Sequence, residues 1–152
     1  MAVAKIAIEF RPSPLSYGIK GSISVSSVPL ISVVDDDDSV RVATGDLVET
    51  FGYDVETFES CEAFLGSRSL DKTRCLIADV QMPGMSGPQL QEYLINCGIN
   101  IPVIFITAIP HSGTCDRVIK RGAIAYLAKP FDRATLQKPL QRALGDEGMY
   151  CN

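Results

Sequence analysis

The chain lacks the sequence features of several common protein classes. Its glycines show neither G-x-G-x-x-G nor G-x-x-x-x-G-K-[ST] spacing, so no nucleotide-binding loop is expected. The one histidine, His111, has no neighbour that completes a nucleophilic triad, and we interpret it as a loop residue. No apolar run reaches the roughly 18 residues of a membrane-spanning helix. Lys5, Glu9 and Arg11 interrupt the N-terminus before a signal peptide could form. These absences predict a cytoplasmic protein that has no contact with a membrane.

The net charge and the cysteine content exclude further classes of protein. The net charge of −4 argues against direct binding of nucleic acid, which needs basic residues to neutralise phosphates. Four consecutive aspartates, residues 35–38, carry as much negative charge as the net charge of the whole chain. The five cysteines are scattered, with no C-x-x-C pair, and the sequence has a single histidine, so neither a disulfide framework nor a zinc site is expected. At 152 residues of ordinary globular composition, we expect one domain.

The sequence divides into three parts. Residues 1–28 hold two prolines, two glycines and a serine-rich tract, and we expect a disordered extension or linker. Residues 29–145 alternate short apolar runs with helical patterns, and residues 146–152 form a short tail. Strict alternation of strands and helices is typical of an α/β fold with a parallel sheet. We predict a flavodoxin-like, doubly wound sheet of five parallel strands in the order 2-1-3-4-5, covered by five helices.

Several details of the helices follow from spacing. Asp38 is the expected N-cap of the first helix, and Ser86 that of the third. Ile95 and Ile119 are expected to face the core from the third and fourth helices. Pro139 falls inside the last helix, where a proline costs about 3 kcal/mol, so a kink or break is expected there.

Polar side chains follow four of the predicted strands. Asp35 and Asp36 follow the first, Asp79 ends the third, Thr107 the fourth, and Lys129 follows the fifth. Because the carboxyl ends of parallel strands share one edge, these groups should converge. A hard cation such as Mg²⁺ would offset the carboxylate repulsion, while a hydroxyl and an ammonium would bind phosphoryl oxygens. Each residue alone also has an ordinary structural explanation, such as a solvated loop, a turn or the end of a strand. Together they predict a phosphoryl-handling site with Asp79 as nucleophile.

These segments together resemble a response-regulator receiver domain of two-component signalling, over residues 30 to about 145. The resemblance rests on four motifs: residues 33–38 (VVDDDD), 79–87 (DVQMPGMSG), 106–108 (ITA) and 129–131 (KPF). Within the family the chain is most similar to the receivers of nitrogen-fixation-type transcriptional regulators. That similarity lies in residues 63–65 (AFL), 99–102 (INIP) and 120–123 (KRGA).

The resemblance implies a role for each site residue. Asp79 would accept phosphate from a sensor histidine kinase and later lose it by self-dephosphorylation. The implied cofactor is Mg²⁺, held by Asp35, Asp36, Asp79 and the backbone carbonyl of Gln81. The implied phosphoryl-binding and switch residues are Thr107, Ala108, Lys129 and Tyr126.

The resemblance also implies the partners. Besides the kinase, we expect a downstream effector protein or an output domain missing from this sequence. A homodimer through the face of the fourth strand, fifth strand and last helix is typical of the family, and Pro139 puts that face in question. Only a short tail follows residue 145, so the expectation is a stand-alone receiver or a fragment of a longer regulator. No turnover of an external substrate is implied.

Two other functions fit part of the pattern. The segment Asp35–Val40 can be read as the nucleophile motif of a haloacid-dehalogenase-like phosphatase. That interpretation leaves Asp79 unexplained, and it lacks the acidic pair expected after the lysine. Alternatively, the chain is a receiver fold that binds partners without taking phosphate. Such proteins generally lack one of the site residues, whereas all are present here.

Overall fold

The computed structural model describes residues 28–145, so the expected extension (apart from Val28) and the expected tail lie outside the described residues. Within this range, five parallel strands form one sheet in the order β2-β1-β3-β4-β5, as predicted. In chain order the elements are β1 (Leu30–Val34), α1 (Asp38–Thr50), β2 (Asp54–Phe58), α2 (Cys61–Leu65), the 3₁₀ helix η4 (Arg68–Asp71), β3 (Thr73–Asp79), α3 (Gly87–Asn96), β4 (Val103–Thr107), α4 (Ser112–Lys120), β5 (Ala125–Ala128) and α5 (Arg133–Leu144).

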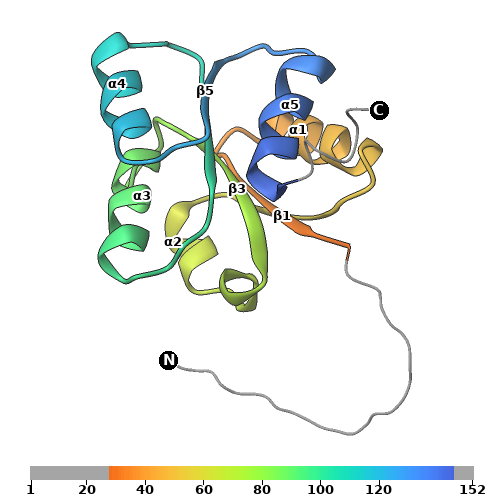
Figure 1. Cartoon of the computed structure of the whole chain (residues 1–152), viewed down its shortest axis with the longest axis horizontal. Coiled ribbons are helices and arrows are strands. Elements are labelled where there is room, and N and C mark those ends of the chain that lie inside the picture. Colours follow the sequence, from red (N-terminus) through yellow and green to blue (C-terminus); the bar gives the residue numbers. More distant parts are fainter. Residues whose placement is uncertain (1–27, 146–152) are drawn as a thin grey trace, which may run out of the picture.

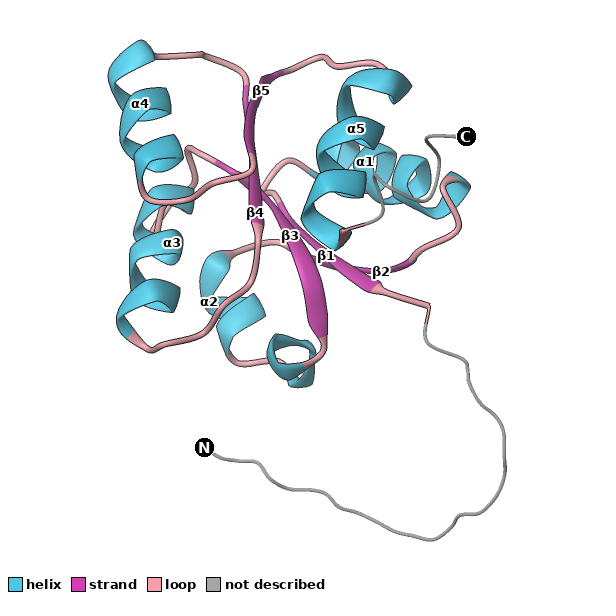
Figure 2. Ribbon diagram, in the orientation of Figure 1, coloured by secondary structure: helices cyan, strands magenta, loops and turns pink. Residues whose placement is uncertain are grey.

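Helices cover both faces of the sheet. Helices α1 and α5 lie on one face, and α2, α3 and α4 lie on the other (Figure 1). Successive side chains of a strand point to opposite faces, so β3 supplies Ile77 to the first core and Leu76 to the second. Both residues are fully buried. Figure 2 shows the strands crossing between these two helical layers. The sheet therefore has only its edges and its two ends free for chemistry.

The helix starts follow local capping chemistry, with one correction. Ser86 caps α3 in a full capping box with Gln89, as predicted. The predicted cap of α1 was wrong: Asp37, not Asp38, is the N-cap, and its side chain accepts a hydrogen bond from the Val40 N–H at 3.0 Å. The reason is backbone conformation: Asp37 is extended, with φ −85° and ψ 114°, and Asp38 is already the first helical residue.

Two predicted core residues are exposed instead. Ile95 and Ile119 are 50% and 43% exposed, whereas their neighbours Leu94 and Val118 are buried. Consecutive residues of a helix point about 100° apart, so only one of each adjacent apolar pair can face the sheet.

The predicted break of the last helix is also wrong. Helix α5 runs unbroken from Arg133 to Leu144 with Pro139 buried inside it. Leu136 and Leu140, on either side of the proline, are fully buried against the sheet. Their packing offsets the lost backbone hydrogen bond, because burying each leucine contributes roughly 1.5–3 kcal/mol.

Gly87 supports a testable prediction about the end of β3. A Cβ at this position would lie 2.3 Å from the Asp79 carbonyl oxygen and 3.0 Å from the Phe105 ring. Backbone and a buried ring cannot yield easily, so we expect Gly87→Ala to lower the free energy of unfolding by about 2 kcal/mol in urea titrations. Gly66→Ala is the matched control, because its nearest contact would be an ordinary 3.5 Å. Equal stability of the two variants would contradict this close packing.

Candidate functional site

The predicted polar residues converge at the carboxyl edge of the sheet. Asp35 directly follows β1, Asp79 ends β3, Thr107 ends β4 and Lys129 directly follows β5. The Lys129 ammonium nitrogen lies 2.9 Å from Asp35 Oδ2 and 3.4 Å from Asp79 Oδ1. One partly buried cation therefore bridges two buried carboxylates at the ends of different strands.

Three carboxylates form a cluster around this bridge. Asp35, Asp36 and Asp79 each offer an oxygen, and these oxygens lie within 4.8 Å of one another. Asp35 and Asp79 are buried, whereas Asp36 is exposed. Asp35 Oδ1 accepts the Asp37 N–H at 2.9 Å. Among the described residues, Asp35 Oδ2 forms no well-angled hydrogen bond despite the nearby ammonium, so it retains acceptor capacity.

This donor set fits a hard divalent cation. Mg²⁺ takes oxygen ligands, and it is usually bound through one or two carboxylates together with waters and phosphate oxygens. A buried carboxylate oxygen with spare acceptor capacity, beside two further carboxylates, meets that requirement. Gln81 lies two residues beyond Asp79, in the loop that leaves the same strand end.

The buried Asp79 and the partly buried Lys129 shift each other's pKa. Burial, followed by the charge of Asp35, raises the pKa of Asp79 to about 6, and Lys129 and the Gln81 backbone N–H oppose that rise. Burial tends to lower the pKa of Lys129, but Asp35 and Asp79 outweigh it and the net shift is upward. The lysine is therefore a permanent cation at neutral pH, and Asp79 is a carboxylate held under electrostatic repulsion.

The Asp79 pKa predicts how stability depends on pH without metal. In Mg²⁺-free buffer, the unfolded state loses this proton near pH 3.8 and the folded state only near pH 6. Protonated Asp79 therefore adds to the free energy of unfolding; this contribution is complete below pH 3.8 and is lost as pH rises to 6. The free energy of unfolding of Asp79→Asn should therefore rise by up to about 3 kcal/mol relative to that of wild type across this pH range, as measured by urea unfolding. A difference that is constant from pH 4 to pH 7 would contradict the shifted pKa.

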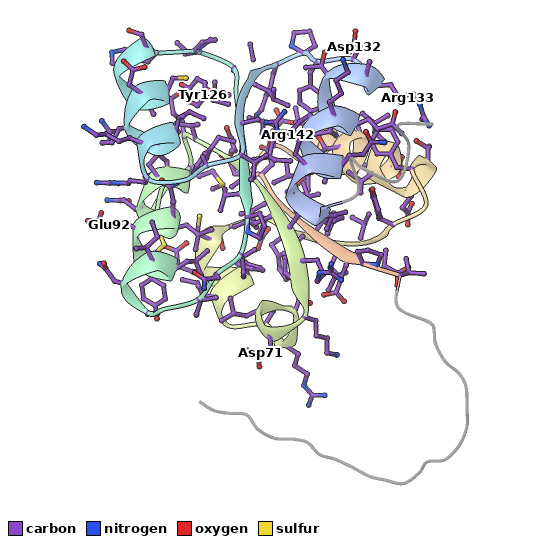
Figure 3. The ribbon with its side chains drawn as sticks, in the orientation of Figure 1. Asp71, Glu92, Tyr126, Asp132, Arg133 and Arg142 are labelled. Atoms are coloured by element: carbon purple, nitrogen blue, oxygen red, sulfur yellow. The ribbon has the colours of Figure 1, made fainter. Side chains whose placement is uncertain are left out.

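The remaining predicted site residues lie around this centre. Thr107 is buried, and its hydroxyl exchanges hydrogen bonds of 3.2 Å with the Ile109 backbone; Ala108 between them is exposed. The Lys129 N–H donates to the Thr107 carbonyl oxygen at 2.8 Å, which joins the two phosphoryl-binding candidates. Tyr126 lies apart from the aspartates: its half-buried side chain lies near the start of α4 (Figure 3), and its hydroxyl accepts the His111 N–H at 3.1 Å.

His111 has a structural role that the sequence interpretation missed. It is the N-cap of α4, and its Nδ1 accepts the Thr114 N–H at 3.2 Å. The available signal was its position directly before Ser112, at the start of a segment with helical spacing. The Tyr126 hydroxyl therefore contacts the backbone of the residue that begins α4.

Comparison with known proteins identifies this arrangement. Residues 31–141 match the model of the response regulator receiver domain. The chain belongs to this family. Response regulator protein TodT of Pseudomonas putida is 36% identical over 131 residues, which cover 86% of this chain and 57% of that protein. The transcriptional regulatory protein FixJ of Azorhizobium caulinodans is 35% identical over 115 residues, which cover 76% and 54%.

Solved structures agree with this assignment. The crystal structure of FixJ-N is 30% identical, with a TM-score of 0.71, and the match covers 79% of this chain and 96% of that one. The similarity to nitrogen-fixation-type regulators, predicted from three short motifs, is thereby confirmed. The receiver spans about half the length of the curated relatives it matches. Receiver domains are phosphoacceptor signalling switches and are generally Mg²⁺-dependent. Across residues 28–145, no helix is both long and apolar enough to cross a bilayer.

Proposed function

We propose that Asp79 is the phosphoacceptor of a two-component signalling switch. The supporting observation is the ammonium of Lys129 placed between Asp35 and Asp79 at the carboxyl edge of the sheet. A carboxylate oxygen of Asp79 attacks the phosphorus, and the bond from phosphorus to the donor histidine nitrogen breaks. The Lys129 ammonium then lies where it can pair with the new phosphoryl oxygens.

The ligands proposed for Mg²⁺ are Asp35, Asp36, Asp79 and the Gln81 backbone carbonyl. When bound, the ion offsets the negative charge that the carboxylates and the incoming phosphoryl group share. Asp35 is held for this task by the Asp37 N–H on one oxygen and leaves the other available. Asp36 is exposed and can reach the same ion from the solvent side.

Thr107 is the proposed link from phosphate to conformation. Its hydroxyl is engaged with the Ile109 backbone, so binding a phosphoryl oxygen requires it to leave those hydrogen bonds. Ala108, directly after it, would place its backbone N–H at the phosphoryl group. The loop that would then move begins at Ile109 and ends at His111, where the Tyr126 hydroxyl is bound. New contacts at the phosphate would thus shift the population of states at the start of α4.

The proposed phosphoryl donor is a sensor histidine kinase. An apolar hollow of about 400 Å³ opens beside Lys129, between α1 and the loop before α5. Its apolar lining includes Val40, Leu47 and Phe131, and Asp37 is also on its wall. A helix that presents a phosphohistidine to Asp79 would bury its apolar side chains here.

The output is proposed to be a downstream effector protein or an output domain, since the relatives are about twice as long. The face of β4, β5 and α5 is available for a homodimer, because α5 continues through Pro139. We infer a cytoplasmic receiver unit over residues 29–145. It hydrolyses its own aspartyl phosphate and turns over no external substrate. It contacts neither nucleic acid nor membrane directly. The phosphatase alternative is not favoured by the family match, and the non-phosphorylated alternative is not favoured by the complete site.

Labelling with a small phosphodonor tests the proposal. We expect the intact mass of the protein to rise by one phosphoryl group after incubation with acetyl phosphate and Mg²⁺, and not when EDTA replaces Mg²⁺. The reason is that repulsion between the carboxylates and an anionic donor is offset only by the cation. A folded protein that binds Mg²⁺ but never gains this mass would support a binding module instead.

A further inference from the structure

The loop that follows Asp79 is held at several points. At its base the Gly87 N–H donates to the Val80 carbonyl oxygen at 3.1 Å, and the Val80 N–H donates to Ile106 of β4 at 3.0 Å. At the start of α3, the Ser86 N–H donates to the Gln89 side chain at 2.9 Å. These bonds lie within the loop, α3 and the neighbouring strand. They leave the outer turn around Gly84 to be held from elsewhere.

Glu62 of α2 holds that outer turn. Its Oε2 accepts the Met85 N–H at 3.0 Å across 23 residues of sequence. The same oxygen lies 2.8 Å from where a Cβ on Gly84 would be, so the carboxylate lies directly against this glycine. Gly84 has a φ of +76°, a left-handed conformation that favours glycine. The Glu62 carboxylate thus contacts the turn at two adjacent residues: Gly84, whose φ is left-handed, and the N–H of Met85.

The turn and the metal ligand belong to one short loop. Only Met82 and Pro83 separate Gln81 from Gly84, and the proline restricts the backbone of the residue before it. The Gln81 backbone N–H also lowers the pKa of Asp79, which ties this loop to the site. With the base held at Val80 and the turn held at Met85, the intervening Gln81 carbonyl has little freedom.

We propose that Glu62 is a positioning residue for Mg²⁺, acting through the loop that carries the Gln81 carbonyl. This inference rests on the proposed function of that loop. Residues that orient metal ligands from behind typically change metal affinity by about 10–100-fold when they are removed. Glu62 is exposed and is none of the three carboxylates that cluster at the site, so its contact with the site runs through the loop backbone.

Four variants test the inference. Glu62→Ala removes the acceptor, and Glu62→Gln keeps an acceptor without the charge. Gly84→Ala displaces the carboxylate and also strains the left-handed backbone of the turn, and Glu59→Ala is the control. Glu59 is an exposed carboxylate three residues earlier that makes no hydrogen bond to this loop among the described residues. The measurements are Mg²⁺ affinity from amide chemical shifts without phosphodonor, hydrogen exchange of the Met85 N–H, and labelling rates over a range of Mg²⁺ concentrations.

We expect Glu62→Ala to expose the Met85 N–H to exchange and to weaken Mg²⁺ binding roughly tenfold. The labelling rate at saturating Mg²⁺ should change little, since Asp79 and Lys129 are untouched. Gly84→Ala should behave like Glu62→Ala, whereas Glu62→Gln and Glu59→Ala should stay close to wild type. Such a split between Mg²⁺ affinity and maximal rate is not expected from a general loss of stability.

Three outcomes would overturn the inference. If the Met85 N–H exchanges no faster in Glu62→Ala than in wild type, Glu62 does not protect it. If that N–H loses its protection but the Mg²⁺ affinity stays unchanged, the contact does not influence the metal. In both cases wild type still binds Mg²⁺ and takes phosphate, so the proposed function stands. A wild type that does neither overturns the proposed function and this inference together.

Discussion

Asp79→Asn is expected to abolish phosphoryl acceptance while the protein stays folded. The amide has nearly the same shape as the carboxyl group, but its oxygen is too weak a nucleophile to attack phosphorus. The substitution also relieves the repulsion from Asp35 that, together with burial, raises the pKa of Asp79. Intact-protein mass after incubation with acetyl phosphate and Mg²⁺ should show one added phosphoryl group in wild type and none in the variant.

The control for this result is Asp71→Asn. Asp71 is an exposed aspartate in η4, which precedes β3 and so lies at the opposite end of that strand from Asp79 (Figure 3). This variant should be labelled to the same extent as wild type. Full labelling of Asp79→Asn would assign the phosphoryl group to another residue and defeat the proposed site.

Lys129→Met is expected to lower the free energy of unfolding by about 3 kcal/mol in Mg²⁺-free buffer. The methionine keeps much of the side-chain volume but leaves Asp35 and Asp79 buried without the cation that lies between them. Removing one partner of a buried pair is more damaging than losing the attraction alone, because the desolvated charge remains. Urea unfolding at pH 7 measures the loss.

Added Mg²⁺ distinguishes this explanation from simple loss of packing. The cation should restore a large part of the stability of Lys129→Met, since it supplies positive charge to the same carboxylates. Lys138→Met, at an exposed lysine of α5, should be close to wild type with or without Mg²⁺. A deficit in Lys129→Met that Mg²⁺ leaves unchanged would mean that the lysine stabilises the fold by packing and not by charge.

Much of the fold was predictable because the sheet is buried on both faces. The strands appear as short apolar runs, and β4 (Val103–Thr107) is buried at every position. The polar residue that ends each run then falls at the carboxyl edge by geometry alone, which is why Asp79 and Lys129 were identified correctly as neighbours. Helix orientation was less predictable. Ile119 and Val118 are equally apolar in sequence, and only the position of α4 over the sheet decides which of them is buried.

The sequence by itself determined the order of the elements, the family, and which side chains meet at the carboxyl edge, because alternation and strand ends are local properties. Tertiary structure decided what depends on packing between distant segments. Pro139 is tolerated because Leu136 and Leu140 bury themselves on both sides of it. Glu62 meets the Met85 N–H across 23 residues only because α2 lies beside the loop that follows β3. No local pattern encodes such a contact, since its energy arises from the surface that brings the two segments together.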